Sequence, residues 1–196
     1  MRTRQYILEA TERVLQTKGL ARLTSKEIAQ AAGCAEGTLY NHFDTKEALV
    51  LAAIQENLPD LLAVVGDDRI GEHEISENVR EIALAAIRYY RKLIPLTTAL
   101  FADMDLLAHF RLWVQEHRAG PLKIYERVAQ YVAAEQRLGR LKPEIEPFSF
   151  ASLLLGTCHQ YVFIQYFQGQ DPFPVPEGQF VAGIVQTLLQ GAIPPQ

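Results

Sequence analysis

Residues 37–49, GTLYNHFDTKEAL, bring hydroxyl, amide, imidazole and ammonium groups into one short stretch of the chain. The groups belong to Thr38, Tyr40, Asn41, His42 and Lys46. A catalytic loop or a metal site would use some of these residue types. A row of hydrogen-bond donors with one ammonium group, however, also suits the phosphates of a nucleic-acid backbone.

The chain carries no motif of an established catalytic chemistry. It has no H-E-x-x-H pair, no phosphate-binding glycine loop and no elbow around a nucleophilic serine. His109 and His117 are eight residues apart and Cys158 is adjacent to His159, so neither pair has the i, i+4 spacing of metal ligands on one helix face. We therefore predict no enzymatic activity, no metal and no cofactor.

The elements around the opening stretch predict a helix-turn-helix. A helix of about eight residues starts after Thr24 or Ser25 and stops at Gly33, and a second runs from about Ala35 to Asn41. In this arrangement the second helix enters the DNA major groove. Thr24, Ser25 and Lys26 then lie at the N-terminus of the first helix, where free N–H groups favour a phosphate. An amphipathic helical hairpin with a polar face is the alternative.

Apolar residues recur at helical spacing nearly throughout, so we predict an all-α fold of about nine or ten helices. A first helix capped by Thr3 and ending at Gly19, and a fourth capped by Thr45, would complete a small N-terminal domain over residues 1–57. Its expected core is Ile7, Val14, Leu23, Ile28, Leu39, Phe43 and Leu49.

Residues 58–196 are expected to form a second, wholly helical domain. Its expected helices cover residues 76–93, a short segment after Pro95, and residues 105–118, 121–138, 147–167 and 177–189. Residues 148–167 contain no charged side chain and are about long enough to span a bilayer. Polar residues occur in every turn of that stretch, so we predict a helix buried on all sides within protein rather than in a membrane.

Charge and cysteine content restrict the kind of DNA-binding surface and the cellular compartment that we expect. The net charge is −4, with seven basic and seven acidic residues in 1–57, so DNA contacts must come from a local patch. Cys34 and Cys158 are too few for a disulfide framework and are expected as free thiols in the reducing cytoplasm. Glutamates at positions 9 and 12 precede any long apolar run, so the N-terminal segment is not predicted to be a secretory signal.

Residues 23–54, LTSKEIAQAAGCAEGTLYNHFDTKEALVLAAI, resemble the DNA-binding domain of the TetR/AcrR family of transcriptional regulators. Residues 137–151, RLGRLKPEIEPFSFA, show a weaker resemblance to a link between two later helices of that family. The resemblance implies phosphate contacts from Thr24 or Ser25, Thr38, Tyr40, Asn41, His42 and Lys46, and base contacts from Ala35, Glu36 and Gly37.

Two positions within residues 23–54 admit more than one interpretation. Glu36 stands where the family often has a basic or small residue: its carboxylate could accept from a cytosine amino group, or it could be a solvated first-turn acid favoured by the helix dipole. Cys34 is either a packing residue or a redox-sensitive thiol.

The same resemblance implies a homodimer held by the last two helices and an effector pocket among the middle ones. Residues 148–167 and 180–189 are more apolar than one chain's surface requires, which independently favours a partner. Candidate pocket residues are His109, Trp113, Tyr125, Tyr131, His159, Tyr161 and Phe163. We thus expect a ligand-responsive regulator, a repressor on a double-stranded DNA operator that a small lipophilic or aromatic effector releases. A helical small-molecule or lipid carrier without DNA function is the alternative.

Overall fold

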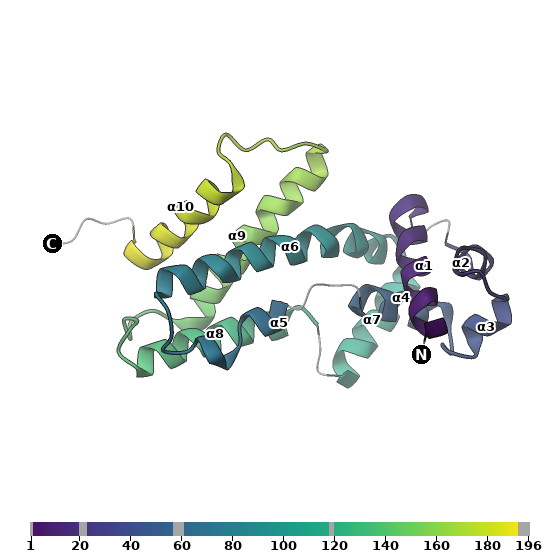
Figure 1. Ribbon diagram of the computed structural model, residues 1–196, viewed down its shortest axis with the longest axis horizontal. Coiled ribbons are helices and arrows are strands. Elements are labelled where there is room, and N and C mark those ends of the chain that lie inside the picture. Colours follow the sequence, from purple (N-terminus) through teal and green to yellow (C-terminus); the bar gives the residue numbers. More distant parts are fainter. Residues whose placement is uncertain (1, 20–22, 57–60, 118–119, 192–196) are drawn as a thin grey trace. The chain divides into compact units, whose positions relative to one another are not determined.

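The computed structural model describes residues 2–19, 23–56, 61–117 and 120–191, and within those ranges the regular structure is entirely helical (Figure 1). The all-α prediction is confirmed. The chain divides into two compact units: the first contains residues 1–58 and 92–119, and the second contains residues 59–91 and 120–196. Residues 92–119, assigned from the sequence to the second region, therefore pack in the unit that holds the helix-turn-helix, and the functional boundary after residue 57 stays a prediction.

The first unit is built on four N-terminal helices, with part of a long helix and one further helix added to them. The N-terminal four are α1 (Arg2–Lys18), α2 (Ser25–Ala32), α3 (Glu36–Tyr40) and α4 (Lys46–Glu56). All seven residues of the predicted core are buried in one cluster. Leu100 and Leu106 join it from α6 (Ile75–Ala102) and α7 (Met104–His117). A five-residue helix such as α3 has too few internal hydrogen bonds to persist alone, so this shared core holds it in place.

The ends of these helices test the expected caps. Gly19 ends α1 with a φ of 72° and donates its N–H to the Leu15 carbonyl over 3.0 Å, as predicted. Thr45 caps α4, because its Oγ1 accepts the Ala48 N–H at 3.0 Å. The prediction for Thr3 was wrong: α1 already begins at Arg2, so Thr3 lies inside the first turn.

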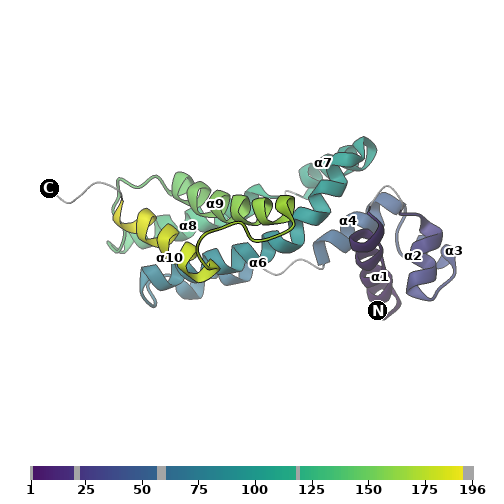
Figure 2. The same cartoon turned by 90° about the horizontal axis from the view of Figure 1, so that it is seen from above.

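The second unit combines a short connecting region with three long helices and the first part of α6. Its other elements are α5 (Leu61–Val64), a 3-10 turn (Asp67–Arg69), α8 (Leu122–Arg137), α9 (Pro147–Gln168) and α10 (Glu177–Gln190). Helix α9 packs along α8 on one side and against α10 on the other (Figure 2). Buried Glu135 and Asn78 fasten the connecting region: Glu135 accepts the Gly71 N–H at 3.1 Å, and Asn78 donates to the Glu72 carbonyl at 2.9 Å.

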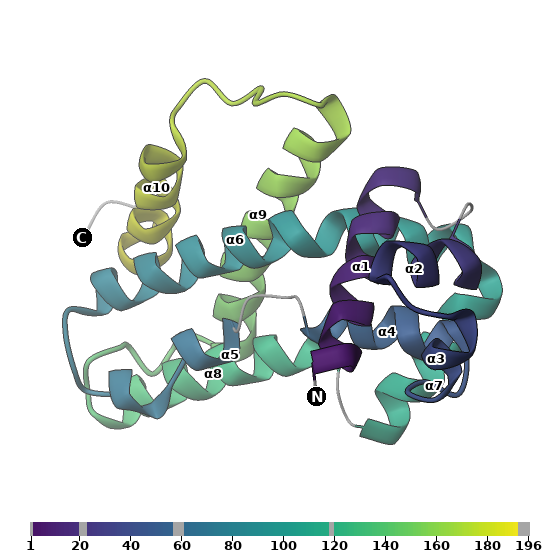
Figure 3. The same cartoon turned by 45° about the vertical axis from the view of Figure 1, so that its right-hand side comes forward.

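Helix α6 differs from the prediction in its length. The sequence predicted a break at Pro95, yet α6 continues through it as one helix of 28 residues (Figure 3). Ile87, Ile94 and Leu100 are 0%, 2% and 3% exposed. Buried side chains therefore hold the helix on both sides of the proline, and their burial offsets the backbone hydrogen bond that Pro95 cannot make.

Helix α9 contains the uncharged stretch that prompted the membrane question. No described helix is long and apolar enough to cross a membrane. The expectation of a helix buried on all sides was nevertheless wrong for the single chain. Leu154, Leu155 and Cys158 are fully buried, while Leu153 is 60% and Phe167 80% exposed. These exposed residues leave part of the apolar surface of α9 uncovered by the described residues of this chain.

Candidate nucleic-acid interface

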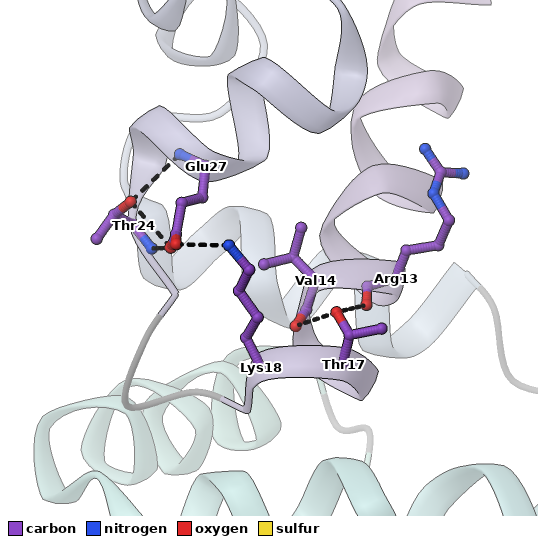
Figure 4. A network of polar contacts seen from close by, with 6 residues as sticks. All are labelled: Arg13, Val14, Thr17, Lys18, Thr24 and Glu27. Atoms are coloured by element: carbon purple, nitrogen blue, oxygen red, sulfur yellow. Dashed lines mark hydrogen bonds and ion pairs between the residues drawn. The ribbon is translucent and has the colours of Figure 1, made fainter.

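A capping box fixes the start of α2 (Figure 4). The Thr24 hydroxyl accepts the Glu27 N–H at 3.2 Å, and the Glu27 carboxylate accepts the Thr24 N–H at 3.2 Å and its O–H at 3.1 Å. Lys18 Nζ lies 2.8 Å from the same carboxylate and, together with the Thr24 N–H, lowers the pKa of Glu27. The hydroxyl hydrogen of Thr24 is therefore committed to Glu27 and is not a free donor for phosphate.

The turn between α2 and α3 depends on a left-handed glycine. Gly33 has φ 67° and ψ 33°, and it donates its N–H to the Gln30 carbonyl at 3.2 Å. The Cys34 N–H then reaches back to the Ala29 carbonyl at 3.0 Å. Side chains with a Cβ rarely adopt this conformation, so Gly33 sets the direction in which the chain enters α3. Cys34 itself is half-buried and packs against the core of the first unit.

Helix α3 presents most of the predicted contact residues on one exposed surface. Leu39 is 2% and Phe43 8% exposed, which anchors the helix and the residues after it. The exposed residues are Ala35, Glu36, Gly37, Tyr40, Asn41 and His42, while Thr38 is half-buried. We call this set, with Thr38, the polar fringe. Its inward anchors and outward polar groups have the arrangement expected of a recognition helix.

A hydroxyl pair connects the polar fringe to α2. Ser25 Oγ and Tyr40 Oη lie 2.7 Å apart, and Tyr40 is 48% exposed. One hydroxyl must donate to the other, so the pair retains a single hydrogen for an outside acceptor. The sequence placed Ser25 and Tyr40 among the phosphate contacts but gave no sign that they are bonded to each other.

Positive charge around the fringe is sparse. Lys26 is exposed in the first turn of α2, and Lys46 is half-buried in the first turn of α4. Arg4 was not predicted: its guanidinium lies 5.2 Å from the centroid of the Phe43 ring. Its position in α1 is remote in sequence from Phe43, and only the fold brings the two together. Residues 1–57 carry as many acidic as basic residues, so these cations do not belong to a strongly basic domain.

Comparison with known proteins decides the family. Residues 7–53 match the family described as bacterial regulatory proteins, tetR family. The transcriptional regulator UidR of Escherichia coli strain K12 is 26% identical over 157 residues, which cover 80% of this chain and 78% of UidR. The chain belongs to the TetR family. It is accordingly a helix-turn-helix DNA-binding regulator of transcription and not an enzyme.

Two solved structures of TetR-type fold align over nearly the whole chain. FadR of Bacillus subtilis, in complex with stearoyl-CoA, has a TM-score of 0.70 at 16% identity and covers 96% of this chain and 99% of its own. SmeT, in complex with triclosan, has a TM-score of 0.69 at 17% identity and covers 95% and 91%. At such identities the likeness concerns the fold alone.

The structure distributes the candidate effector residues over both units of this TetR-family chain. His109 and Trp113 belong to the first, where Trp113 stacks on Phe110 with ring centroids 6.4 Å apart. Tyr161 is fully buried against Phe173 and Phe180, with centroids at 4.4 and 4.3 Å. Tyr131 is also buried and accepts a hydrogen bond from Asn78. These four residues are separate from a further aromatic cluster, which contains His159 and Phe163 and lies next to Tyr125.

That cluster is an aromatic strip, which we define as Tyr90 of α6 with His159, Phe163 and Phe167 of α9. Tyr90 meets His159 edge to face at 5.1 Å; His159 and Phe163, and then Phe163 and Phe167, are nearly parallel at 6.3 and 6.1 Å. Phe163 is 45% exposed. The sequence missed Tyr90, although its spacing of four from Ala86 and Ile94 placed it on the buried stripe.

The strip is electrically neutral near pH 7. Burial, and next the neighbouring Tyr125 hydroxyl, raises the pKa of Tyr90, and burial lowers the pKa of His159. Cys158 beside it is buried and donates to the Ala83 carbonyl at 3.7 Å, and burial raises the pKa of this thiol to about 12. A protonated, enclosed thiol is a packing residue rather than a nucleophile.

Proposed function

We propose that this chain is a dimeric repressor that places α3 in the major groove of a near-palindromic operator and leaves the DNA when a small, uncharged aromatic effector binds. The observation that carries the DNA half is the polar fringe: Leu39 and Phe43 are buried beneath it, and its residues Tyr40, Asn41 and His42 are exposed. A carrier without DNA function would have no use for this surface.

Roles within the fringe follow from position and chemistry. Tyr40, through its bond to Ser25, together with Thr38, Asn41, His42 and Lys46, contacts phosphates. Ala35 and Gly37 are small and allow the start of α3 to approach the base edges closely, which brings the Glu36 carboxylate within reach of a cytosine amino group. Thr24 supports α2 through its capping box and contributes to DNA binding indirectly.

The dimer is supported by an apolar groove between α9 and α10. Leu153, Val175, Phe180, Ile184 and Leu188 line it. Leu153 is 60% exposed, and the groove bears no charged side chain among its lining residues. Twofold pairing of these helices in a four-helix bundle would bury the groove, and a dimer of helix-turn-helix domains reads half-sites about 34 Å apart.

The effector class is supported by the aromatic strip. FadR binds stearoyl-CoA, whose phosphates require cations, whereas SmeT binds triclosan. Arg91 follows Tyr90 in the sequence, but its guanidinium forms an ion pair with Glu177 of α10, so its charge is already engaged. Stacking surface with neutral donors and acceptors favours an aromatic ligand over an acyl-CoA.

Footprinting of the purified protein on the DNA flanking its own gene tests the DNA half. We expect one protected region with two related half-sites. A protein that protects no discrete site, or that elutes as a monomer at micromolar concentration, would contradict the proposal.

The effector half needs a separate assay. Triclosan and stearoyl-CoA are titrated into the protein–operator complex while fluorescence anisotropy is followed. A coupling of ~1–3 kcal/mol corresponds to operator binding weakened about 5- to 150-fold. We expect this from triclosan or a similar phenol, with the response lost in Phe163→Ala and kept in Phe110→Ala, a ring outside the strip. Release by stearoyl-CoA alone would refute the effector class and leave the DNA half intact.

A further inference from the structure

Arg4 connects the first turn of α1 with the end of α3. Its guanidinium lies 5.2 Å from the centroid of the Phe43 ring, and its side chain is half-buried. A cation within about 6 Å of an aromatic ring is attracted to the electron-rich face of that ring. The contact therefore fixes a positive charge beside the segment that follows α3, although Arg4 and Phe43 are far apart in the sequence.

Contact with a ring does not consume the hydrogen-bonding capacity of an arginine. The N–H donors of a guanidinium lie in its plane, whereas the ring attracts the charge of the group as a whole. Arg4 can therefore pack on Phe43 and donate to an acceptor in the same arrangement. The planar fork of donors matches two oxygens of one phosphate, a geometry that a lysine ammonium cannot reproduce.

Phe43 places this charge next to the polar fringe. The Phe43 N–H donates to the Leu39 carbonyl at 2.9 Å, and the ring is 8% exposed in the core of the first unit. Asn41 and His42, the residues directly before it, are exposed at the end of the fringe. Because Phe43 is fixed to α3 through Leu39, Arg4 keeps its position relative to Asn41 and His42.

The position of Arg4 is unfavourable for the dipole of α1. A helix dipole disfavours a cation near the N-terminus, and the first turn of α1 contains no acidic residue. An acceptor from outside the chain would offset this cost. Residues 1–57 carry as many acidic as basic residues, so contact with DNA phosphates depends on single cations that are placed correctly.

We propose that Arg4 donates to a phosphate of the DNA backbone and that its contact with Phe43 holds it in place for this role. The role rests on the proposed function, in which α3 enters the major groove. Helix α1 then contributes one cation per protomer to the interface, in addition to Lys26 of α2 and Lys46 of α4.

The salt dependence of DNA binding separates a phosphate contact from a role in folding. Binding of the full chain to a labelled duplex from the DNA flanking its gene, and to a mixed-sequence duplex of equal length, is followed by fluorescence anisotropy over a range of KCl concentrations. Arg4→Gln should flatten the slope of log K against log salt by about 0.9 per protomer on both duplexes. Its affinity for the flanking duplex at low salt should fall about tenfold or more per protomer. Arg4→Lys keeps the charge and should keep the slope.

Arg13→Gln is the matched control. Arg13 lies nine residues after Arg4 in the same helix, which at about 3.6 residues per turn places it on the opposite face of α1. It donates to the Ala31 carbonyl at 3.3 Å. Its substitution removes the same charge from residues 1–57 and should leave the salt slope unchanged.

Two results would overturn the inference. One is a salt slope of Arg4→Gln equal to that of the wild type, even if urea unfolding shows a loss of stability, because Arg4 would then only cover Phe43. The other is equal flattening by Arg13→Gln, since the effect would then come from net charge alone. In both cases the wild-type protein would still protect its operator, whereas failure of the proposed function is seen in the wild-type footprint itself.

Discussion

The hydroxyl pair between Ser25 and Tyr40 makes the contact of α3 with DNA open to a quantitative test. The two oxygens lie 2.7 Å apart, and Tyr40 is the more exposed partner. If Ser25 donates to Tyr40, the spare hydrogen belongs to Tyr40 and points away from the pair toward an outside acceptor. Tyr40→Phe then removes the donor to phosphate, whereas Ser25→Ala removes only the group that orients it.

The two effects differ in size. A hydrogen bond to a charged group is worth about 1.5–3 kcal/mol, so Tyr40→Phe should weaken operator binding about 10- to 150-fold per protomer, and by the square of that factor in a symmetric dimer. Ser25→Ala removes a neutral and partly exposed bond worth about 0.5–1.5 kcal/mol, mostly as folding stability, and should weaken binding by less. The double variant should bind no worse than Tyr40→Phe.

Fluorescence anisotropy with a labelled operator duplex at fixed salt gives the three affinities, and urea unfolding gives the stability of each variant. The reasoning is refuted if Tyr40→Phe binds within twofold of wild type, or if Ser25→Ala costs more affinity than Tyr40→Phe. Additive losses in the double variant would mean that the two hydroxyls contact DNA independently and that the 2.7 Å bond does not persist in the complex.

Four further predictions use single substitutions. Thr24→Ala should lower the free energy of unfolding by about 1 kcal/mol and Thr24→Ser should retain it, as urea midpoints would show, because only serine preserves the capping box. Lys46→Ala should flatten the slope of log K against log salt by about one unit per protomer, with Lys123→Ala unchanged; equal slopes for Lys46→Ala and wild type would exclude the phosphate contact. Glu36→Ala should abolish preference for one symmetric C·G pair in a selection from random duplexes, whereas an unchanged preference would identify Glu36 as a solvated acid. The Glu146 carboxylate accepts hydrogen bonds from the Ser149 and Phe148 N–H groups, and these bonds lower the pKa of Glu146. A lowered pKa stabilises the fold while the carboxylate is ionised, and this stabilisation is lost as the pH falls through the pKa of the folded state. The difference in unfolding free energy between wild type and Glu146→Gln should therefore narrow in acid, and a difference that stays constant with pH would contradict the prediction.

Local signals predicted the helix-turn-helix well. Thr24, Gly33 and Thr45 act at the positions that their chemistry suggested, and all seven predicted core residues are buried. Such features depend on a few neighbouring residues, so the sequence contains them directly. The engagement of the Thr24 hydroxyl by Glu27 was also local, since threonine followed three residues later by glutamate is the signature of a capping box.

Features that depend on distant contacts escaped prediction. Pro95 normally ends a helix, yet buried Ile94 and Leu100 carry α6 through it. Arg4 reaches Phe43 only because α1 packs against the core that Phe43 closes. The proximity of Tyr90 to His159 likewise requires α6 and α9 to lie together, which no spacing within either helix reveals.

The balanced charge of residues 1–57, with seven basic and seven acidic residues, limits how much of the affinity for DNA can come from bulk charge. Lys26 and Lys46 lie at the starts of α2 and α4, and one phosphate contact from each would contribute about −1.8 per protomer to the salt slope. Non-specific binding, which depends on such charges, should therefore be weak. Affinity for the operator must then come mainly from directed hydrogen bonds of the polar fringe, which are effective only while Leu39, Phe43 and the Gly33 turn hold α3 in one orientation. Because that orientation carries most of the affinity, a small reorientation of α3 would be enough to release the DNA.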